Sequence, residues 1–293
     1  MNIYIEPTSY IILLLTVFLL AFCSSAPAPT PPADTSLGAG FRYSIYGPTY
    51  DPGPDFWTSV SEQMSARFPD AHPMGIWIIG DIEGNQVFLN FPGTSADPNI
   101  LFGLTDDNES ALTNFDQHNV KIWLQVEPGD ADMLTLLDLV LSRYKKHSCV
   151  IGFGVDVEWY HSTSREAEGT PVTDTEAAAW IGAVRAHNPN YRLFLKHWDT
   201  AFMPPTVRDG IVFIDDSQQF TSLDQAVDEF AVWGETFAPA PVGFQFGYED
   251  DRFWWSALQN PPADIGNAIL SAVPNTAALF WVDFTILDVF PPK

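Results

Sequence analysis

The sequence predicts a single (β/α)8 barrel, in which eight parallel strands alternate with helices. Three observations favour this fold: about 250 residues follow a proline-rich segment, eight short apolar runs recur along them, and helical patterns lie between the runs. Neither an internal repeat nor a second linker indicates two domains. The alternative is an open doubly wound sheet, but none of the runs is followed by the glycine-rich phosphate loop typical of such folds.

The expected barrel strands are short apolar runs, and most of them end at a charged or polar residue. In chain order these runs are residues 41–46, 75–80, 120–126, 150–157, 191–196, 211–214, 242–246 and 277–282. Residues 86–91 are expected to form an extra strand in the loop that follows the second run.

Capping residues and apolar spacing predict the helices. Asp132 precedes apolar residues that recur at helical spacing through residues 133–144, and Thr173 and Glu176 have the spacing of a capping box. The expected helices are residues 55–68 and 109–118, and four that begin at Asp132, Thr173, Ser222 and Asp264.

The N-terminal segment is typical of export. Residues 10–22 are apolar and uncharged, which is short for a bilayer span but typical of a signal-peptide core. Residues 1–23 are therefore expected to be a signal peptide or a membrane or lipid anchor, residues 24–40 a proline-rich linker, and residues 41–293 the barrel.

Three alternatives remain open for this segment: a cleaved signal, an uncleaved anchor, or a lipoprotein acylated at Cys23, because residues 20–23 resemble a lipoprotein processing site. Each of them places the barrel outside the cytoplasm, secreted or at the cell surface. Any membrane association is expected only through the N-terminal segment.

The chain is strongly acidic, with a formal net charge of −24 over 293 residues. Such a surface repels nucleic acid and anionic lipid, so no nucleic-acid partner is expected. The charge suits ligands that are neutral, cationic or bound to a metal.

Acidic residues gather just where the expected strands end. In a barrel these ends meet at the C-terminal mouth, where active sites of this fold lie. These acids are Asp81, Glu83, Glu127, Asp156, Glu158, Asp199, Asp215, Asp216, Glu249, Asp250 and Asp283. Aromatic residues such as Trp159, Trp198 and Tyr248 accompany them. Acids for proton transfer beside flat aromatic faces favour a carbohydrate ligand.

The fourth run carries the sharpest signal. Side chains two apart on a strand share a face, so Gly152 and Gly154 share theirs with Asp156 and Glu158. Two carboxylates at the end of a buried strand are costly, which favours a role in chemistry over packing.

Residues 152–159 resemble the end of the fourth barrel strand of glycoside hydrolase family 18 chitinases, D-x-x-D-x-D-x-E, and the D-x-E strand of family 25 lysozymes. The resemblance implies that Glu158 is the general acid and that Asp156 orients the 2-acetamido group of the substrate. Ile151 and Gly154 stand where the family 18 motif has its two earlier aspartates.

Among the aromatic residues, Trp281 is the first candidate for stacking on a sugar ring of the substrate. By strand alternation it shares a face with Leu279 and Asp283, and that face is expected to point into the mouth. The other expected substrate-binding residues are Asp283, Trp198, Asp215, Gln218, Tyr248, Glu127 and Asp81.

The leading functional hypothesis is an extracytoplasmic glycoside hydrolase that acts on a neutral or N-acetylated polysaccharide. A non-catalytic carbohydrate-binding barrel tethered at the cell surface is the second hypothesis, and a metal-dependent hydrolase or deacetylase is the third. No cofactor and no metal ligands are expected, because transition metals usually recruit histidine and only His161 and His197 lie near strand ends.

Overall fold

The structure is a computed structural model that describes Met1, residues 36–162 and residues 169–292. The chain divides into two units, Met1–Pro31 and Pro32–Lys293, and the described helices and strands all belong to the second. The expected signal or anchor, and most of the linker, lie outside the described residues. Within the described part, no helix is both long and apolar enough to cross a membrane.

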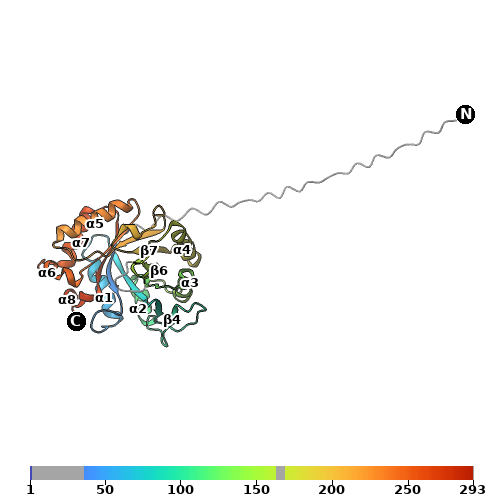
Figure 1. Cartoon of the computed structure of the whole chain (residues 1–293). Coiled ribbons are helices and arrows are strands. Elements are labelled where there is room, and N and C mark those ends of the chain that lie inside the picture. Colours follow the sequence, from blue (N-terminus) through green and yellow to red (C-terminus); the bar gives the residue numbers. More distant parts are fainter. Residues whose placement is uncertain (2–35, 163–168, 293) are drawn as a thin grey trace. The chain divides into compact units, whose positions relative to one another are not determined.

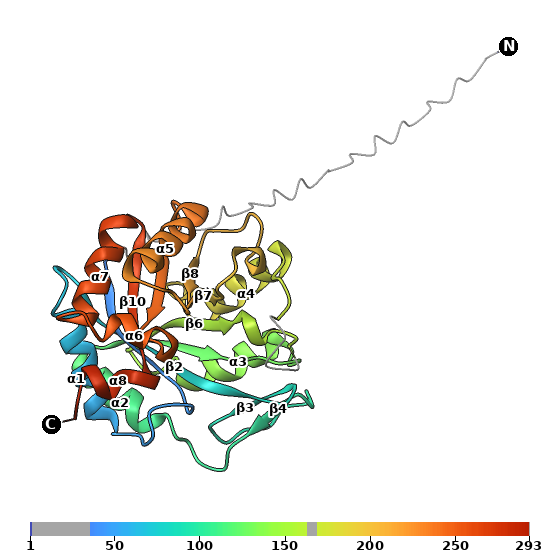
Figure 2. The same ribbon diagram turned by 60° about the vertical axis from the view of Figure 1, so that its left-hand side comes forward.

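Eight parallel strands close into a barrel, as predicted (Figures 1 and 2). Around the barrel they are β1 (Gly38–Tyr43), β2 (His72–Glu83), β5 (Lys121–Val126), β6 (Val150–Asp156), β7 (Arg192–Lys196), β8 (Ile211–Asp215), β9 (Val242–Phe246) and β10 (Thr276–Val282). β1 pairs in parallel with both β10 and β2, and this double pairing closes the sheet. The first strand begins three residues before its expected start, inside the segment assigned to the linker.

Two short strands extend the sheet beyond the barrel. β3 (Gln86–Leu89) pairs antiparallel with the end of β2, and β4 (Ile100–Phe102) pairs in parallel with β3. β3 is the extra strand expected from the sequence. Figure 2 shows this extension at the edge of the barrel, beside the end of β2.

Helices follow most of the barrel strands and cover the sheet. They are α1 (Pro54–Ser65), α2 (Glu109–His118), α3 (Met133–Tyr144), α4 (Asp174–His187), α5 (Leu223–Phe237), α6 (Arg252–Trp255), α7 (Pro261–Ala272) and α8 (Ile286–Val289). Between β7 and β8 the described chain forms a short 3₁₀ turn, η2 (Thr200–Phe202), in place of an α-helix.

The predicted caps are confirmed at three of the four helices. Asp132 and Ser222 accept backbone hydrogen bonds at the starts of α3 and α5, and Thr173 forms a capping box at α4. The prediction for Asp264 is wrong. α7 begins at Pro261, because proline suits the first helical turn, and Asp264 accepts from the Asn260 amide from inside the helix.

The barrel is stabilised by two apolar cores, one inside the strands and one between the strands and the helices. The interior is filled by Met74, Ile76, Trp123, Phe194, Val212, Ile214, Ala278 and Phe280. A larger cluster lies between the strands and the helices. Gly152 and Gly154 face the interior, where a β-carbon would collide with the rings of Trp123 and Phe194 respectively, so these glycines make room for the aromatic filling.

Candidate active site at the mouth of the barrel

Buried polar side chains gather above the apolar filling, where the barrel strands end. We call this group the mouth cluster: Arg42, Asp81, Gln125, Glu127, Asp156, Glu158, Lys196, Asp216, Gln245 and Asp283. All of them except Glu158 are at most 8% exposed. Because burying ionised groups is costly, their pairing determines which of them carry charge.

Lys196 is the cation that links three acids of the cluster. It is the last residue of β7, lies beside Asp156 in the strand register, and its Nζ is 2.9 Å from Asp156 Oδ2 and 3.9 Å from Glu158 Oε2. Its Nζ also donates to Asp216 Oδ2. Burial by itself favours the neutral amine, but the three carboxylates outweigh it and raise the pKa of Lys196 well above its usual value. Lys196 therefore remains an ammonium ion.

Asp156 ends β6 and is held from two sides. In addition to the Lys196 ammonium, the Gln125 amide donates to Asp156 Oδ2 at 3.1 Å, and the side chain is 2% exposed. Burial raises the pKa of Asp156, and Lys196 opposes that rise. These contacts anchor one carboxylate oxygen deep in the mouth.

Glu158 lies nearer to solvent than Asp156. β6 ends at Asp156, and the chain continues as a 3₁₀ turn, η1 (Val157–Trp159), so strand alternation does not extend to Glu158. Its side chain is 23% exposed, and it makes no hydrogen bond to the described residues. Burial raises the pKa of Glu158, and Lys196 opposes the rise. A partly exposed carboxyl with a raised pKa is suited to donate a proton to a bound reactant.

Glu127 directly follows β5 and is fixed through one oxygen. Its Oε2 accepts hydrogen bonds from the Tyr46 hydroxyl at 2.5 Å and from the Ile82 amide at 2.9 Å. Burial raises the pKa of Glu127, although both hydrogen bonds stabilise its ionised form. Tyr46 follows β1 and is 44% exposed, so it places an aromatic ring at the edge of the mouth.

Asp81 lies in β2 and is 3% exposed. Neither of its carboxylate oxygens has a hydrogen-bond partner among the described residues. Burial, with a smaller contribution from the Glu127 charge, raises the pKa of Asp81 to about 8. Asp81 is therefore mostly a neutral acid at pH 7.

Asp283 closes the mouth between the first and the last barrel strands. Its carboxylate binds Arg42 at 2.5 Å and accepts from the Ser44 hydroxyl at 2.7 Å. Burial raises the pKa of Asp283 to about 6, against the lowering effect of Arg42 and Ser44. The exposed ring of Phe284 covers the Arg42 guanidinium, 4.6 Å from it.

The expected orientation of Trp281 is wrong. Its ring is fully buried in the layer between strands and helices, packs 5.3 Å from the Trp255 ring, and donates to the Thr285 hydroxyl at 2.9 Å. β10 ends at Val282, and Asp283 begins a 3₁₀ turn, η4 (Asp283–Thr285). The Asp283 side chain therefore points into the mouth, whereas the Trp281 side chain points away from it.

Asp215 and Asp216 face opposite sides of the sheet. Asp215 ends β8 on the same face as Phe213, whose ring stacks on Phe237 of α5 at 4.1 Å. Asp215 is fully buried there and accepts from the Ser217 amide at 2.8 Å. Asp216, which the sequence did not favour as a binding residue, is the one that enters the mouth cluster.

The remaining expected binding residues differ in accessibility. Trp198 is half-buried, with its ring stacked on His197 at 4.2 Å, and Gln218 is exposed. Tyr248 is buried, and its hydroxyl donates to the Gln245 side chain at 3.2 Å.

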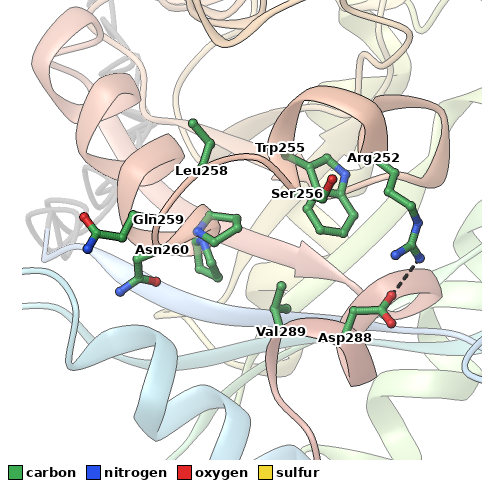
Figure 3. Close-up of a pocket in the computed structure, with 10 residues that line it drawn as sticks. Arg252, Trp255, Ser256, Leu258, Gln259, Asn260, Asp288 and Val289 are labelled. Carbon is green, nitrogen blue, oxygen red and sulfur yellow. Dashed lines mark hydrogen bonds and ion pairs between the residues drawn. The ribbon is translucent and has the colours of Figure 1, made fainter.

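A separate pocket of about 380 Å³ lies beside the barrel, between α6, α7 and α8 (Figure 3). Figure 3 shows Arg252 on one side of it, next to Trp255. Arg252 pairs with Asp288, with a nitrogen–oxygen distance of 2.7 Å. None of the expected site residues lines this pocket.

One group of described residues has ligand atoms close enough to hold a metal ion: Asp116, His147 and Cys149, within 4.8 Å of one another. Cys149 precedes β6, so the group lies at the end of the barrel opposite the mouth. Asp116 already accepts from the Cys149 amide at 2.7 Å and lies 2.7 Å from the His147 ring nitrogen, which explains the cluster as local packing.

Sequence reasoning missed both cations of the mouth cluster, Arg42 and Lys196, together with Tyr46. The sequence could have indicated Lys196, because it ends an apolar run at a position that faces the barrel interior. A lysine buried there needs carboxylate partners. Alternation along β1 likewise points Arg42 inward. The contact between Tyr46 and Glu127 spans 81 residues, so no local pattern could indicate it.

No protein-family model matches the sequence. No curated protein matches it significantly. Among solved structures, a provisionally assigned alpha-L-fucosidase from Bacteroides thetaiotaomicron VPI-5482 is 12% identical, with a TM-score of 0.41 over 92% of this chain and 91% of that one. A β-D-glucuronidase of Dictyoglomus thermophilum is 12% identical, with a TM-score of 0.47 over 84% of this chain and 43% of that one.

A GH5-4 broad-specificity endoglucanase from an uncultured bacterium is 9% identical, with a TM-score of 0.42 over 84% of this chain and 87% of that one. Because these identities and TM-scores are low, the fold is established here by the strand pairing of the chain itself. A function can be inferred only from the residues at the mouth of its barrel.

Proposed function

We propose that this protein is an extracytoplasmic glycoside hydrolase that acts on a neutral or N-acetylated polysaccharide, with Glu158 as the general acid. The observation that carries the proposal is the state of Glu158: partly exposed at the barrel mouth, without a hydrogen-bond partner among the described residues, and with a pKa raised by burial. Hydrolysis of a glycoside requires a proton on the leaving oxygen, which such a carboxyl supplies.

The surroundings of Glu158 support this role. Lys196 pairs with Asp156 and Asp216 and so holds these two carboxyl groups in place beside Glu158. Tyr46, Phe284 and Trp198 expose ring surface on loops that follow barrel strands, and such rings suit the C–H faces of sugars. Export of the chain is supported by the apolar run at residues 10–22.

Replacement of Glu158 by Gln tests the proposal. The variant should keep its fold and lose turnover by roughly 100- to 10,000-fold, because an amide cannot donate the proton. The matched control is Glu235→Gln, which changes an exposed glutamate of α5. Reducing-sugar release from a panel of neutral and N-acetylated glycans is the measurement, and unchanged release by Glu158→Gln would refute the role of Glu158.

A non-catalytic carbohydrate-binding barrel is the second candidate. The observation that favours it is the anchoring of Asp156 by Lys196 and Gln125, which opposes a swing of Asp156 toward a substrate acetamido group. Binding on a glycan array without release of reducing sugar from any bound glycan would select this alternative.

A further inference from the structure

Glu127 differs from the other carboxylates of the mouth cluster in how it is held. Asp156 and Asp216 pair with Lys196, and Asp283 pairs with Arg42. Among the described residues, no cation lies within ion-pair distance of Glu127. The protein instead holds it with two hydrogen-bond donors.

Both donors bind the same oxygen of Glu127. The Tyr46 hydroxyl lies 2.5 Å and the Ile82 amide 2.9 Å from Oε2, while Oε1 accepts no hydrogen bond from the described residues. Two donors on one oxygen define the plane and the direction of the carboxylate. The other oxygen is left to act on a reactant.

Glu127 and Glu158 follow adjacent parallel strands. β5 and β6 are paired up to Val126 and Val155. Glu127 comes directly after β5, and Glu158 lies two residues beyond the end of β6, in the turn η1. Their charges interact, because the charge of Glu127 contributes to the raised pKa of Glu158. Two carboxyl groups at one mouth, one partly exposed and one fixed, match the pair that glycoside hydrolysis needs.

We propose that Glu127 is the second catalytic carboxylate, acting as general base, and that Tyr46 is its positioning residue. This inference rests on the proposed function. The C–O bond of the glycoside breaks, and its electron pair goes to the leaving oxygen, which takes the proton of Glu158. Water bonds to the anomeric carbon and gives its proton to Glu127 Oε1, so the product has an inverted configuration.

The burial-raised pKa of Glu127 is consistent with a group that must take up a proton during turnover. The role also differs from substrate assistance. In that mechanism Asp156 would orient an acetamido group, and substrates without one would not react.

The first test is the pair Glu127→Gln and Glu127→Ala, assayed on glycosides with and without a 2-acetamido group. We expect kcat to fall by roughly 100- to 10,000-fold on both substrates, with little change in KM. Azide should restore turnover of Glu127→Ala as a glycosyl azide, because azide attacks without losing a proton. A raised KM with unchanged kcat and no azide rescue would show that Glu127 only binds substrate.

The second test is Tyr46→Phe, with Tyr50→Phe as the matched control, since Tyr50 is also exposed in the same loop. The Tyr46 hydroxyl stabilises ionised Glu127, so its loss should raise the pKa of Glu127. The acid limb of the kcat/KM profile should therefore move to higher pH in Tyr46→Phe and stay in place in Tyr50→Phe. An unmoved limb in Tyr46→Phe would overturn the positioning role.

The third test is the anomeric configuration of the first product that the wild-type protein releases, measured by NMR. Inversion supports the base role, and retention overturns it. If the wild-type protein hydrolyses no glycoside, the proposed function itself has failed. If Glu158→Gln is inactive while Glu127→Gln retains its kcat, only the present inference has failed.

Discussion

At the scale of single residues, Asp81 shows how burial sets protonation at the mouth. Its side chain is 3% exposed and has no partner among the described residues, and burial raises its pKa from 3.8 to about 8. Between these values the folded protein holds a proton that the unfolded chain has released. The free energy of unfolding must therefore decrease as pH rises through this range.

This linkage leads to a measurable effect of Asp81→Asn. The wild-type protein should lose stability between about pH 4 and pH 8, and the variant, which cannot ionise, should lose less. Urea unfolding at pH 5 and pH 8 measures the difference, with Asp228→Asn on the exposed face of α5 as control. Equal pH slopes in the wild type and Asp81→Asn would contradict the raised pKa.

At the scale of secondary-structure elements, β6 shows why a barrel strand beneath the mouth cluster carries glycine. Gly154 pairs with Gln125 and Phe194, and a β-carbon at this position would enter the Phe194 ring. The glycine is needed so that Phe194 can fill the interior beneath the mouth cluster.

The same contact predicts the cost of adding one methyl group. Gly154→Ala should lower the free energy of unfolding by about 1–3 kcal/mol, because a well-packed interior must shift to accept it. Gly182→Ala is the matched control: Gly182 is exposed in α4 with open space around its Cα, and alanine there should stabilise the helix by about 0.5–1 kcal/mol. Denaturant unfolding measures both changes, and a neutral or stabilising Gly154→Ala would show that the space beside Phe194 accepts a methyl group.

Strand alternation predicted the side-chain orientation of residues within the strands correctly. It did not do so for residues beyond the strand ends. It placed Gly152, Gly154 and Asp156 on the inward face correctly, because all three lie within β6. It failed for Trp281, since the argument ran through Asp283, which lies past the end of β10. Active-site residues of a barrel occupy such ends, so the least regular positions are also the functional ones.

At the scale of the whole molecule, the number and order of barrel strands could be predicted because each apolar run is a local feature of the sequence. The pairing of distant side chains could not. Arg42 meets Asp283 across 241 residues, and this contact exists only because β1 and β10 close the barrel. The net charge of −24 also concealed that the mouth contains two buried cations among its acids.

Barrel closure brings Glu158 and Glu127 to the same mouth. It also places Lys196 where it pairs with Asp156 and Asp216. In the proposed reaction Glu158 protonates the leaving group. The effect of losing this proton should depend on the leaving group, because a good leaving group departs without a proton.

The most direct measurement compares wild type and Glu158→Gln on two aryl glycosides of one sugar, with a poor and a good leaving group. We predict a loss in kcat/KM of roughly 100-fold or more for the poor leaving group and little loss for the good one. Equal losses for both substrates, or no loss for either, would contradict the assignment of Glu158 as the general acid.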